Sequence, residues 1–259
     1  APHSDKKINL KLLIPSAGKI YLKLTYRLKK EIPLLQRGHI LGFDEIKLTN
    51  ADGRNRQAVT WLEKETSSSQ IKVEQTDTQI VLQSENFRYI LDKRTGMFIQ
   101  LQFAGTDYLN HPMELNIWRA PTDNDMYIRE EWKKARYDHA YTRAYCTELL
   151  QDSHGVLLME RLAVVAAAVQ KILDVQITWK IDGSGKLTSI ISVTKDKEFP
   201  DLPRFGIRLF LNKQLENISY FGMGPQESYR DKHQGSCHGW YQSKVSQMHE
   251  DYIHPQENG

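Results

Sequence analysis

Segments in which apolar and polar residues alternate recur along the chain and predict a mostly β fold. Residues 20–28 (IYLKLTYRL) alternate strictly, which turns one face of a strand inward and the other outward. Residues 43–48 (FDEIKL) show the same pattern over a shorter length. A polar stretch rich in turn-forming residues then follows as far as about residue 70, and it predicts a linker between domains.

Two hairpins are predicted farther along the chain, because paired strand patterns flank short turns. They span residues 87–103 (FRYILDKRTGMFIQLQF) and residues 175–193 (VQITWKIDGSGKLTSIISV). In the second hairpin we expect two core faces: Val175, Ile177, Trp179 and Ile181 on one strand, and Leu187, Ile191 and Val193, with Ser189 between them, on the other. These faces predict a large antiparallel sheet.

The hairpins fit two architectures, a large two-sheet sandwich or a barrel. The absence of periodic motifs favours the sandwich. One helix is predicted at about residues 127–138, because Asp125 suits an N-cap and two glutamates follow in the first turns. The first 50 residues hold too few strands for an independent core. We therefore expect a truncated small sandwich at 1–50, a linker at 51–70 and a large domain at 71–259.

Composition excludes several classes of protein. The 35 basic and 32 acidic residues nearly balance, so there is no concentrated basic charge for nucleic acid. The longest apolar run, 162–169, is far shorter than the ~20 residues that span a membrane. The two cysteines, Cys146 and Cys237, have no spacing for zinc or a disulfide framework, and we interpret both as free thiols. The first ten residues lack the apolar core of a signal peptide, which favours a bacterial cytoplasmic protein over the alternative of a periplasmic or secreted one.

The segment WRAPTDND concentrates candidate chemistry in eight positions. Asp123 and Asp125 are carboxylates two residues apart, which suits acid–base catalysis or cation binding, but no further ligand follows at a recognisable interval. The alternative is an Asx-rich turn in which Arg119 pairs with one aspartate. The residues favour this turn, and its structural members are Trp118, Arg119, Asp123, Asn124 and Asp125.

A second segment, YFGMGPQESYRD, predicts a strand that ends in a sharp turn. Its Gly-x-Gly lacks the third glycine, the Lys-Ser/Thr pair and the following helix of phosphate-binding loops. Two acidic residues four positions apart suit the flanks of a sugar ring, but fixing the turn or pairing with basic neighbours is the favoured role. The candidate residues are Gly222, Gly224, Pro225, Glu227 and Asp231.

These segments resemble a known family. WRAPTDND (118–125), YFGMGPQESYRD (220–231) and SQMHEDYIHPQENG (246–259) together are similar to the C-terminal part of bacterial glycoside hydrolase family 2 β-galactosidases, the large tetrameric type. That region is also called the small chain. The resemblance is most specific over about 75–259, and RGHILGFDEIKL (37–48) resembles the end of the family's preceding immunoglobulin-like domain.

The resemblance implies a fold and a truncation. The family's last domain is a large antiparallel supersandwich similar to galactose mutarotase, here preceded by a partial immunoglobulin-like β-sandwich. In the family, a sugar-binding domain, a first immunoglobulin-like domain and a catalytic TIM barrel precede this region, and the last domain continues beyond PQENG. We therefore expect a fragment that works with the remaining domains, or with a large chain, in a homo-oligomer. Missing partner domains should leave apolar surface and cause weak self-association.

The resemblance also implies where the chemistry lies. A retaining β-galactosidase uses two carboxylates, and in the family both are glutamates of the TIM barrel, as are the ligands of the catalytic magnesium. No residue here corresponds to them, so we expect no cofactor in this chain, no catalysis by it alone and galactoside binding only in the intact enzyme. The family's mobile active-site rim loop maps onto Met126, Tyr127, Ile128 and Arg129. This segment is shorter and lacks the loop's initial glycine.

Two other functions compete with a non-catalytic fragment of a β-galactosidase. A mutarotase-like aldose epimerase needs a histidine acid and a carboxylate base. The pair Asn110-His111 is followed by proline and does not continue into the mutarotase motif, so His111 is interpreted as a loop residue. A free-standing carbohydrate-binding module needs an exposed aromatic platform. Candidates for it are Trp118, Trp132 and Trp240, whereas Trp179 alternates with core aliphatic residues.

Overall fold

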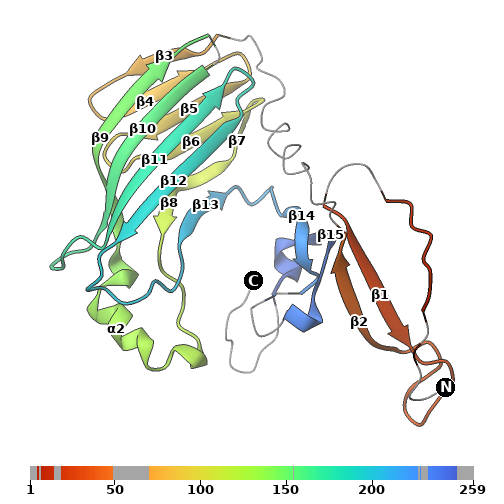
Figure 1. Ribbon diagram of the computed structural model, residues 1–259. Coiled ribbons are helices and arrows are strands. Elements are labelled where there is room, and N and C mark those ends of the chain that lie inside the picture. The colour runs from red at the N-terminus through yellow and green to blue at the C-terminus, as the bar shows by residue number, and fades with distance from the viewer. Residues whose placement is uncertain are drawn as a thin grey trace. The chain divides into compact units, whose positions relative to one another are not determined.

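The computed structural model describes residue 5 and residues 7–14, 19–48, 70–153, 155–226, 228 and 233–249. Within these ranges the regular elements are mostly strands, with one α-helix and short 3₁₀ helices (Figure 1). The predicted all-β sandwich class is therefore confirmed. No helix in the described ranges has the length and apolar character needed to cross a membrane.

The chain forms two compact units. The first contains Ala1–Lys64 and Ser219–Tyr241, and the second contains Glu65–Ile218 and Gln242–Gly259. Most of the predicted linker, 51–70, lies outside the described residues. The predicted domain boundaries therefore stay a prediction. The two units are described separately below.

Two hairpins make up the first unit. β1 (Tyr21–Arg27) pairs antiparallel with β2 (Ile40–Lys47), and β14 (Asn217–Gly224) pairs with β15 (Cys237–Lys244). The strands predicted at 20–28 and 43–48 are therefore present, and the second begins earlier than its pattern indicated.

The side chains between these hairpins are mostly polar and aromatic. The main-chain N–H of His238 donates to a Glu45 carboxylate oxygen at 2.6 Å, and Nδ1 of the same histidine lies 2.6 Å from the other oxygen. The Tyr21 ring stacks on the His238 ring with centroids 4.0 Å apart. Lys23 Nζ lies 3.0 Å from the buried thiol of Cys237. Both cysteines are free, as predicted.

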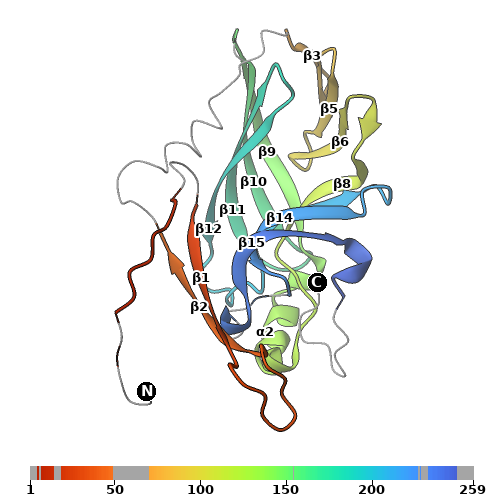
Figure 2. The ribbon, with the colours of Figure 1, turned by 90° about the vertical axis from the view of Figure 1, so that its right-hand side faces the viewer.

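The second unit is a sandwich of two antiparallel sheets that face each other (Figures 1 and 2). One sheet has the order β3 (Lys72–Gln75), β4 (Gln79–Gln83), β5 (Phe87–Asp92), β6 (Met97–Phe103) and β7 (Thr106–Asp107). The other has the order β12 (Leu187–Lys195), β11 (Leu173–Asp182), β10 (Gly155–Val165) and β9 (Tyr141–Gln151). β8 (Leu109–Asn116) pairs with β13 (Gly206–Leu211).

The core lies between the two sheets. The Phe98 ring of β6 meets the Trp179 ring of β11 edge-on, with centroids 5.2 Å apart. The inward face predicted for β11 is confirmed, since its side chains are each 1% exposed: Val175, Ile177, Trp179 and Ile181. The predicted inward residues of β12 are only partly buried against this core: Leu187, Ile191 and Val193.

Both predicted hairpins form, and in each a glycine at positive φ is held by close packing. A Cβ on Gly96 (φ 71°) would lie 2.3 Å from the Leu162 side chain. A Cβ on Gly185 (φ 86°) would lie 2.8 Å from the Phe87 ring. Only glycine meets both requirements at these positions, namely the left-handed backbone and the missing side chain.

The helix α2 (Ile128–Lys134) is shorter than the predicted 127–138. Arg136 takes a left-handed conformation (φ 60°) and ends it, and a 3₁₀ turn follows at Tyr137–His139. An unbroken helix would turn Trp132 and Tyr137 about 140° apart, because they are separated by five residues. The break allows both side chains to be buried, at 3% and 1% exposure.

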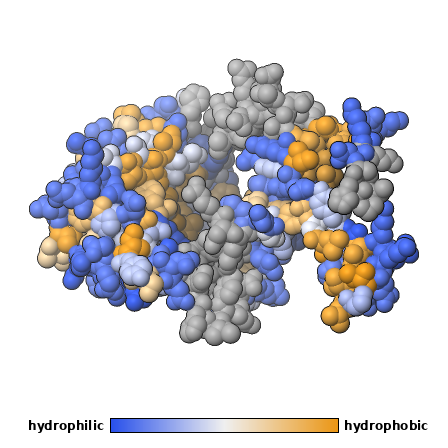
Figure 3. Space-filling view, turned by 60° about the horizontal axis from the view of Figure 1, so that its bottom comes forward, coloured by the Kyte–Doolittle hydropathy of each residue, from blue (hydrophilic) through white to orange (hydrophobic). Residues whose placement is uncertain are grey.

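Apolar side chains also reach the surface. Figure 3 shows hydrophobic patches among the hydrophilic surface of the described chain. In the second unit the exposed apolar residues include Tyr145, Ile190, Leu209 and Leu211.

Candidate functional site

The segment WRAPTDND follows β8 as a tied turn. Asn116, the last residue of β8, holds the chain on both sides: its Nδ2 donates to the carbonyl of Trp118 at 2.8 Å, and its Oδ1 accepts from the Trp118 N–H at 3.2 Å. The Trp118 ring packs edge-on against Trp132 of α2, with centroids 6.3 Å apart. The turn is thereby fixed to the helix that follows it.

An ion pair closes the turn. Arg119 Nη1 lies 2.8 Å from Asp125 Oδ2, and Nη2 donates to Oδ1 at 3.0 Å. Asp125 is 7% exposed, and its Oδ2 also accepts from the Thr122 N–H at 2.8 Å and the Thr122 hydroxyl at 3.1 Å. The favoured interpretation of Asp125 as a turn anchor paired with Arg119 matches these contacts. A carboxylate with this many donors has little capacity left for a cation or a substrate.

The other candidates in this segment are placed differently. Asp123 and Asn124 are exposed. Within the described part of the chain the Asp123 carboxylate makes no hydrogen bond. No contact therefore supports its predicted role as a second anchor of the turn. Nor does that part contain a cluster of three His, Cys, Asp or Glu side chains positioned to hold a metal ion.

The predicted rim-loop residues come directly after this turn. Met126 and Tyr127 are 53% and 83% exposed. Ile128 begins α2 and packs against the core, and Arg129 is exposed on the helix. Two of the four residues thus belong to a helix, and the exposed pair precedes it. Whether they line an active site stays a prediction.

Side chains of this region also hold a segment distant in sequence, by binding its main-chain carbonyls. Trp132 Nε1 donates to the carbonyl of Asp201 at 2.8 Å, and the Tyr137 hydroxyl donates to that of Pro200 at 2.8 Å. Arg119 Nε donates to the carbonyl of Pro203 at 3.2 Å. Burial, and then the nearby Asp201, raises the pKa of Tyr137 to about 12, so this hydroxyl remains a donor at neutral pH. No sequence motif indicated these contacts.

The glycine-rich candidate lies at the end of β14. A Cβ on Gly224 would lie 2.8 Å from the Tyr220 hydroxyl and from the Tyr241 ring, whereas one on Gly222 would come no closer than 3.6 Å to any atom. The Tyr220 hydroxyl also donates to the carbonyl of Pro225 at 3.3 Å. Gly224 is therefore required by packing. Glu227, Asp231 and the segment 250–259 lie outside the described residues.

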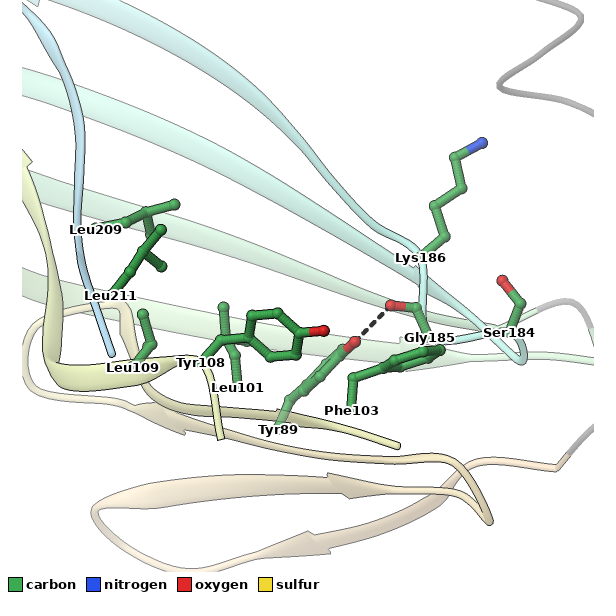
Figure 4. Close-up of a pocket in the computed structure, with 10 residues that line it drawn as sticks. All are labelled: Tyr89, Leu101, Phe103, Tyr108, Leu109, Ser184, Gly185, Lys186, Leu209 and Leu211. Atoms are coloured by element: carbon green, nitrogen blue, oxygen red, sulfur yellow. Dashed lines mark hydrogen bonds between the residues drawn. The ribbon is translucent and has the colours of Figure 1, made fainter. Parts of the chain in front are cut away.

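A pocket of about 450 Å³ opens between the sheets of the second unit (Figure 4). Leu109, Leu209 and Leu211 of β8 and β13 lie at one end of it, the β11–β12 turn lies at the other, and Leu101 of β6 lies among the aromatic rings. The Tyr89 hydroxyl donates to the carbonyl of Gly185 at 2.6 Å and so joins the two sheets. No aspartate, glutamate or histidine lines this pocket. It offers apolar surface, and no carboxylate or imidazole for acid–base catalysis.

Two other sequence candidates have clear positions. The interpretation of His111 as a loop residue was wrong: it is exposed on strand β8, and its ring packs edge-on against Phe210 of β13 with centroids 5.7 Å apart. Of the tryptophans considered for sugar stacking, Trp132 and Trp179 are buried, whereas Trp240 is 75% exposed beside the Phe221 ring, at a centroid distance of 5.6 Å. The sequence alone did not distinguish these environments.

Comparison with known proteins places the chain in a family. A family profile described as the β-galactosidase small chain matches residues 83–259. The chain is 38% identical over its whole length to a β-galactosidase of Actinobacillus pleuropneumoniae and covers 25% of that protein. It is 29% identical over its whole length to a β-galactosidase of Staphylococcus xylosus and covers 26% of it. The chain thus spans about a quarter of the length of these relatives.

Proposed function

Because the chain belongs to the β-galactosidase small-chain family, we propose that it is a non-catalytic part of a β-galactosidase, an enzyme that hydrolyses terminal β-D-galactosides. The match to the small-chain profile over residues 83–259 carries this proposal. The relatives named above are called β-galactosidases and are about four times as long as the stretch they share with this chain.

In the described part of the chain, the pocket of the second unit holds no pair of acids, which supports the non-catalytic role. Retaining hydrolysis needs two carboxylates about 5 Å apart at the scissile bond. The pocket of the second unit is lined by none. Three buried carboxylates of the described chain lie elsewhere, and each is engaged: Asp92 by Arg94, Asp125 by Arg119, and Glu160 by Trp179 and Thr147. The catalytic acids and any magnesium ion would then belong to another part of the enzyme.

The tied turn supports a role at the rim of the active site. Its ion pair and its tryptophan contact hold the chain in place up to Asp125, and the exposed Met126 and Tyr127 follow at once. A rigid base with exposed side chains at its end suits a loop that borders a pocket built by another domain. In this proposal the partners are the remaining domains, or a large chain, within a homo-oligomer in the cytoplasm.

A chimaera tests the proposal. The matching segment of the A. pleuropneumoniae β-galactosidase is replaced by this chain, and hydrolysis of a chromogenic β-galactoside is measured. We expect an active chimaera and no hydrolysis by the chain alone. Hydrolysis by the isolated chain would overturn the non-catalytic role. A chimaera that folds and assembles without activity would overturn the assignment of this stretch to the enzyme.

Sugar binding is a second candidate function, favoured by the exposed Trp240 beside Phe221. Aromatic rings of this kind can stack on the apolar face of a pyranose ring. Titration with galactose and lactose, followed by tryptophan fluorescence, tests it in the isolated chain. We expect the signal change to be lost in Trp240→Ala and kept in a Trp118→Phe control. A response that persists in Trp240→Ala would exclude this surface as the binding site.

A further inference from the structure

β12 forms an outer edge of the four-stranded sheet, and no strand in the described residues pairs with its outer side. The N–H of Asp182 donates to the carbonyl of Lys186, and the N–H of Asp196 donates to that of Ile172. In an antiparallel ladder, hydrogen-bonded residue pairs alternate with pairs that are not hydrogen-bonded. Because Lys186 and Asp196 bond to the preceding strand, the even-numbered residues of β12 make the main-chain hydrogen bonds to β11. The N–H and C=O groups that point outward belong to Leu187, Ser189, Ile191, Val193 and Lys195.

The core is incompletely covered at this edge. The inward side chains of β11 are at most 1% exposed, whereas the inward Leu187, Ile191 and Val193 of β12 are only partly buried. On the opposite face of the same strand, Ile190 is 54% exposed. Apolar surface therefore continues past the last strand of the sheet.

The other edges of the two large sheets are protected, and β12 is not. β9 has a bulge in its pairing with β10 and carries Arg143 and Glu148. β3 has four residues, with an ion pair between Lys72 and Glu74, and β7 has two residues. β12 has nine residues in an unbroken register, without proline, and its one charged residue stands at its end. Long, regular and weakly charged edges favour pairing with another strand.

We propose that a second copy of this chain pairs antiparallel with the free edge of β12, around a two-fold axis at Ile191. Ile191 then lies opposite Ile191 of the second copy, Ser189 opposite Val193, and Leu187 opposite Lys195. All nine residues of β12 take part. Each residue whose main-chain N–H and C=O groups point outward lies opposite such a residue in the second copy, so the two strands can form hydrogen bonds. The inward faces match as well, so the two cores join under one continuous sheet.

The strand is complementary to itself in this register. On the outer face Thr188 lies opposite Thr194, and Ile190 opposite Ser192, both favourable cross-strand neighbours. The one charge, Lys195, meets Leu187 of the second copy rather than another lysine. About ten main-chain hydrogen bonds would form. A single strand pair buries less than the roughly 1,200–2,000 Å² of a stable interface, so the dimer should be weak and dependent on concentration.

Sedimentation equilibrium of the isolated chain, with its variants, tests the dimer. Ser189→Pro removes an outward N–H and leaves the bonds to β11 intact, so the monomer should keep its fold while the dissociation constant rises roughly tenfold or more. Ser189→Lys places a charge on the joined inner face and should act in the same direction. The matched control, Gln176→Lys, adds the same charge on the solvent face of β11, outside the proposed strand pair, and should leave dimerisation within about threefold of the parent.

Hydrogen exchange resolved by residue identifies the surface. The amides of Ser189, Ile191 and Val193 should become protected as concentration rises, while the even-numbered amides of β12 are protected throughout. A monomer at all concentrations, or a dimer that survives Ser189→Pro, overturns the proposal. Protection of the odd-numbered amides that does not depend on concentration also overturns it, since a segment of the same chain would then cover the edge. None of these outcomes depends on the chimaera experiment.

Discussion

The indole nitrogen of Trp179 donates a hydrogen bond to the Glu160 carboxylate, with Nε1 and Oε2 2.8 Å apart inside the sandwich. Thr147 donates a second hydrogen bond to the same carboxylate, at 3.2 Å. Glu160 is 2% exposed, and no ion pair joins it to a lysine or arginine of the described chain. Burial raises its pKa to about 7, against the opposing influence of these two hydrogen bonds.

This raised pKa makes folding depend on pH. An unfolded glutamate titrates near 4.5, so the contribution of Glu160 to stability is complete below that pH and is lost as pH rises to about 7. The loss corresponds to about 3 kcal/mol. We expect Glu160→Gln to exceed the parent in unfolding free energy by about 1–3 kcal/mol at pH 8 and to lose this advantage near pH 4.5. Urea unfolding at both pH values measures it; equal pH slopes for the two proteins would contradict it.

The buried ion pair of the turn should dominate its stability. Asp125→Ala leaves the guanidinium of Arg119 without its carboxylate, and we expect a loss of about 3–5 kcal/mol. Asp123→Ala is the matched control: that side chain is exposed, so its effect should stay within about 0.5 kcal/mol. Thermal unfolding of both variants measures the difference. Similar losses would show that the turn does not depend on this pair.

Packing at the end of β14 predicts a contrast between two glycines. Gly224→Ala would place a methyl group against Tyr220 and Tyr241 and should cost about 1–3 kcal/mol of stability. Gly222→Ala has room for the methyl group and should change stability by less than about 0.5 kcal/mol. Chemical denaturation distinguishes them, and equal costs would argue against the close approach at Gly224.

The proposed rim role predicts a change in activity without a change in fold. Tyr127 is 83% exposed, so Tyr127→Ala should leave the unfolding midpoint of the isolated chain unchanged. In the active chimaera the same substitution should lower kcat/KM severalfold. Tyr141→Ala, at a residue 55% exposed on β9, is the control and should leave kcat/KM unaltered. If both variants retain full kcat/KM, Tyr127 does not border the substrate.

Sequence patterns predicted the fold where local chemistry determined it. The alternation in 175–193 placed Trp179 in the core, and the carboxylate-rich turn suggested the partner of Arg119. The contacts to the carbonyls of residues 200, 201 and 203 were not predictable from the sequence. Every residue has a main-chain carbonyl, so no particular residue type marks the acceptor. The helix was predicted too long because it breaks at Arg136, which allows Tyr137 to be buried. That burial depends on the packing of the whole domain and not on the local sequence.

The hydrogen bonds from Arg119, Trp132 and Tyr137 to those carbonyls have a consequence for how the protein can evolve. Every residue presents a carbonyl, so these three hydrogen bonds recognise the path of the backbone at residues 200, 201 and 203 and not the type of side chain there. These bonds therefore allow the residue types at 200, 201 and 203 to vary among homologous proteins as long as the backbone path is kept, whereas Leu202 packs against the core. Selection should fall instead on the three donors, because no other side chain reproduces an indole, a phenol and a guanidinium at those positions.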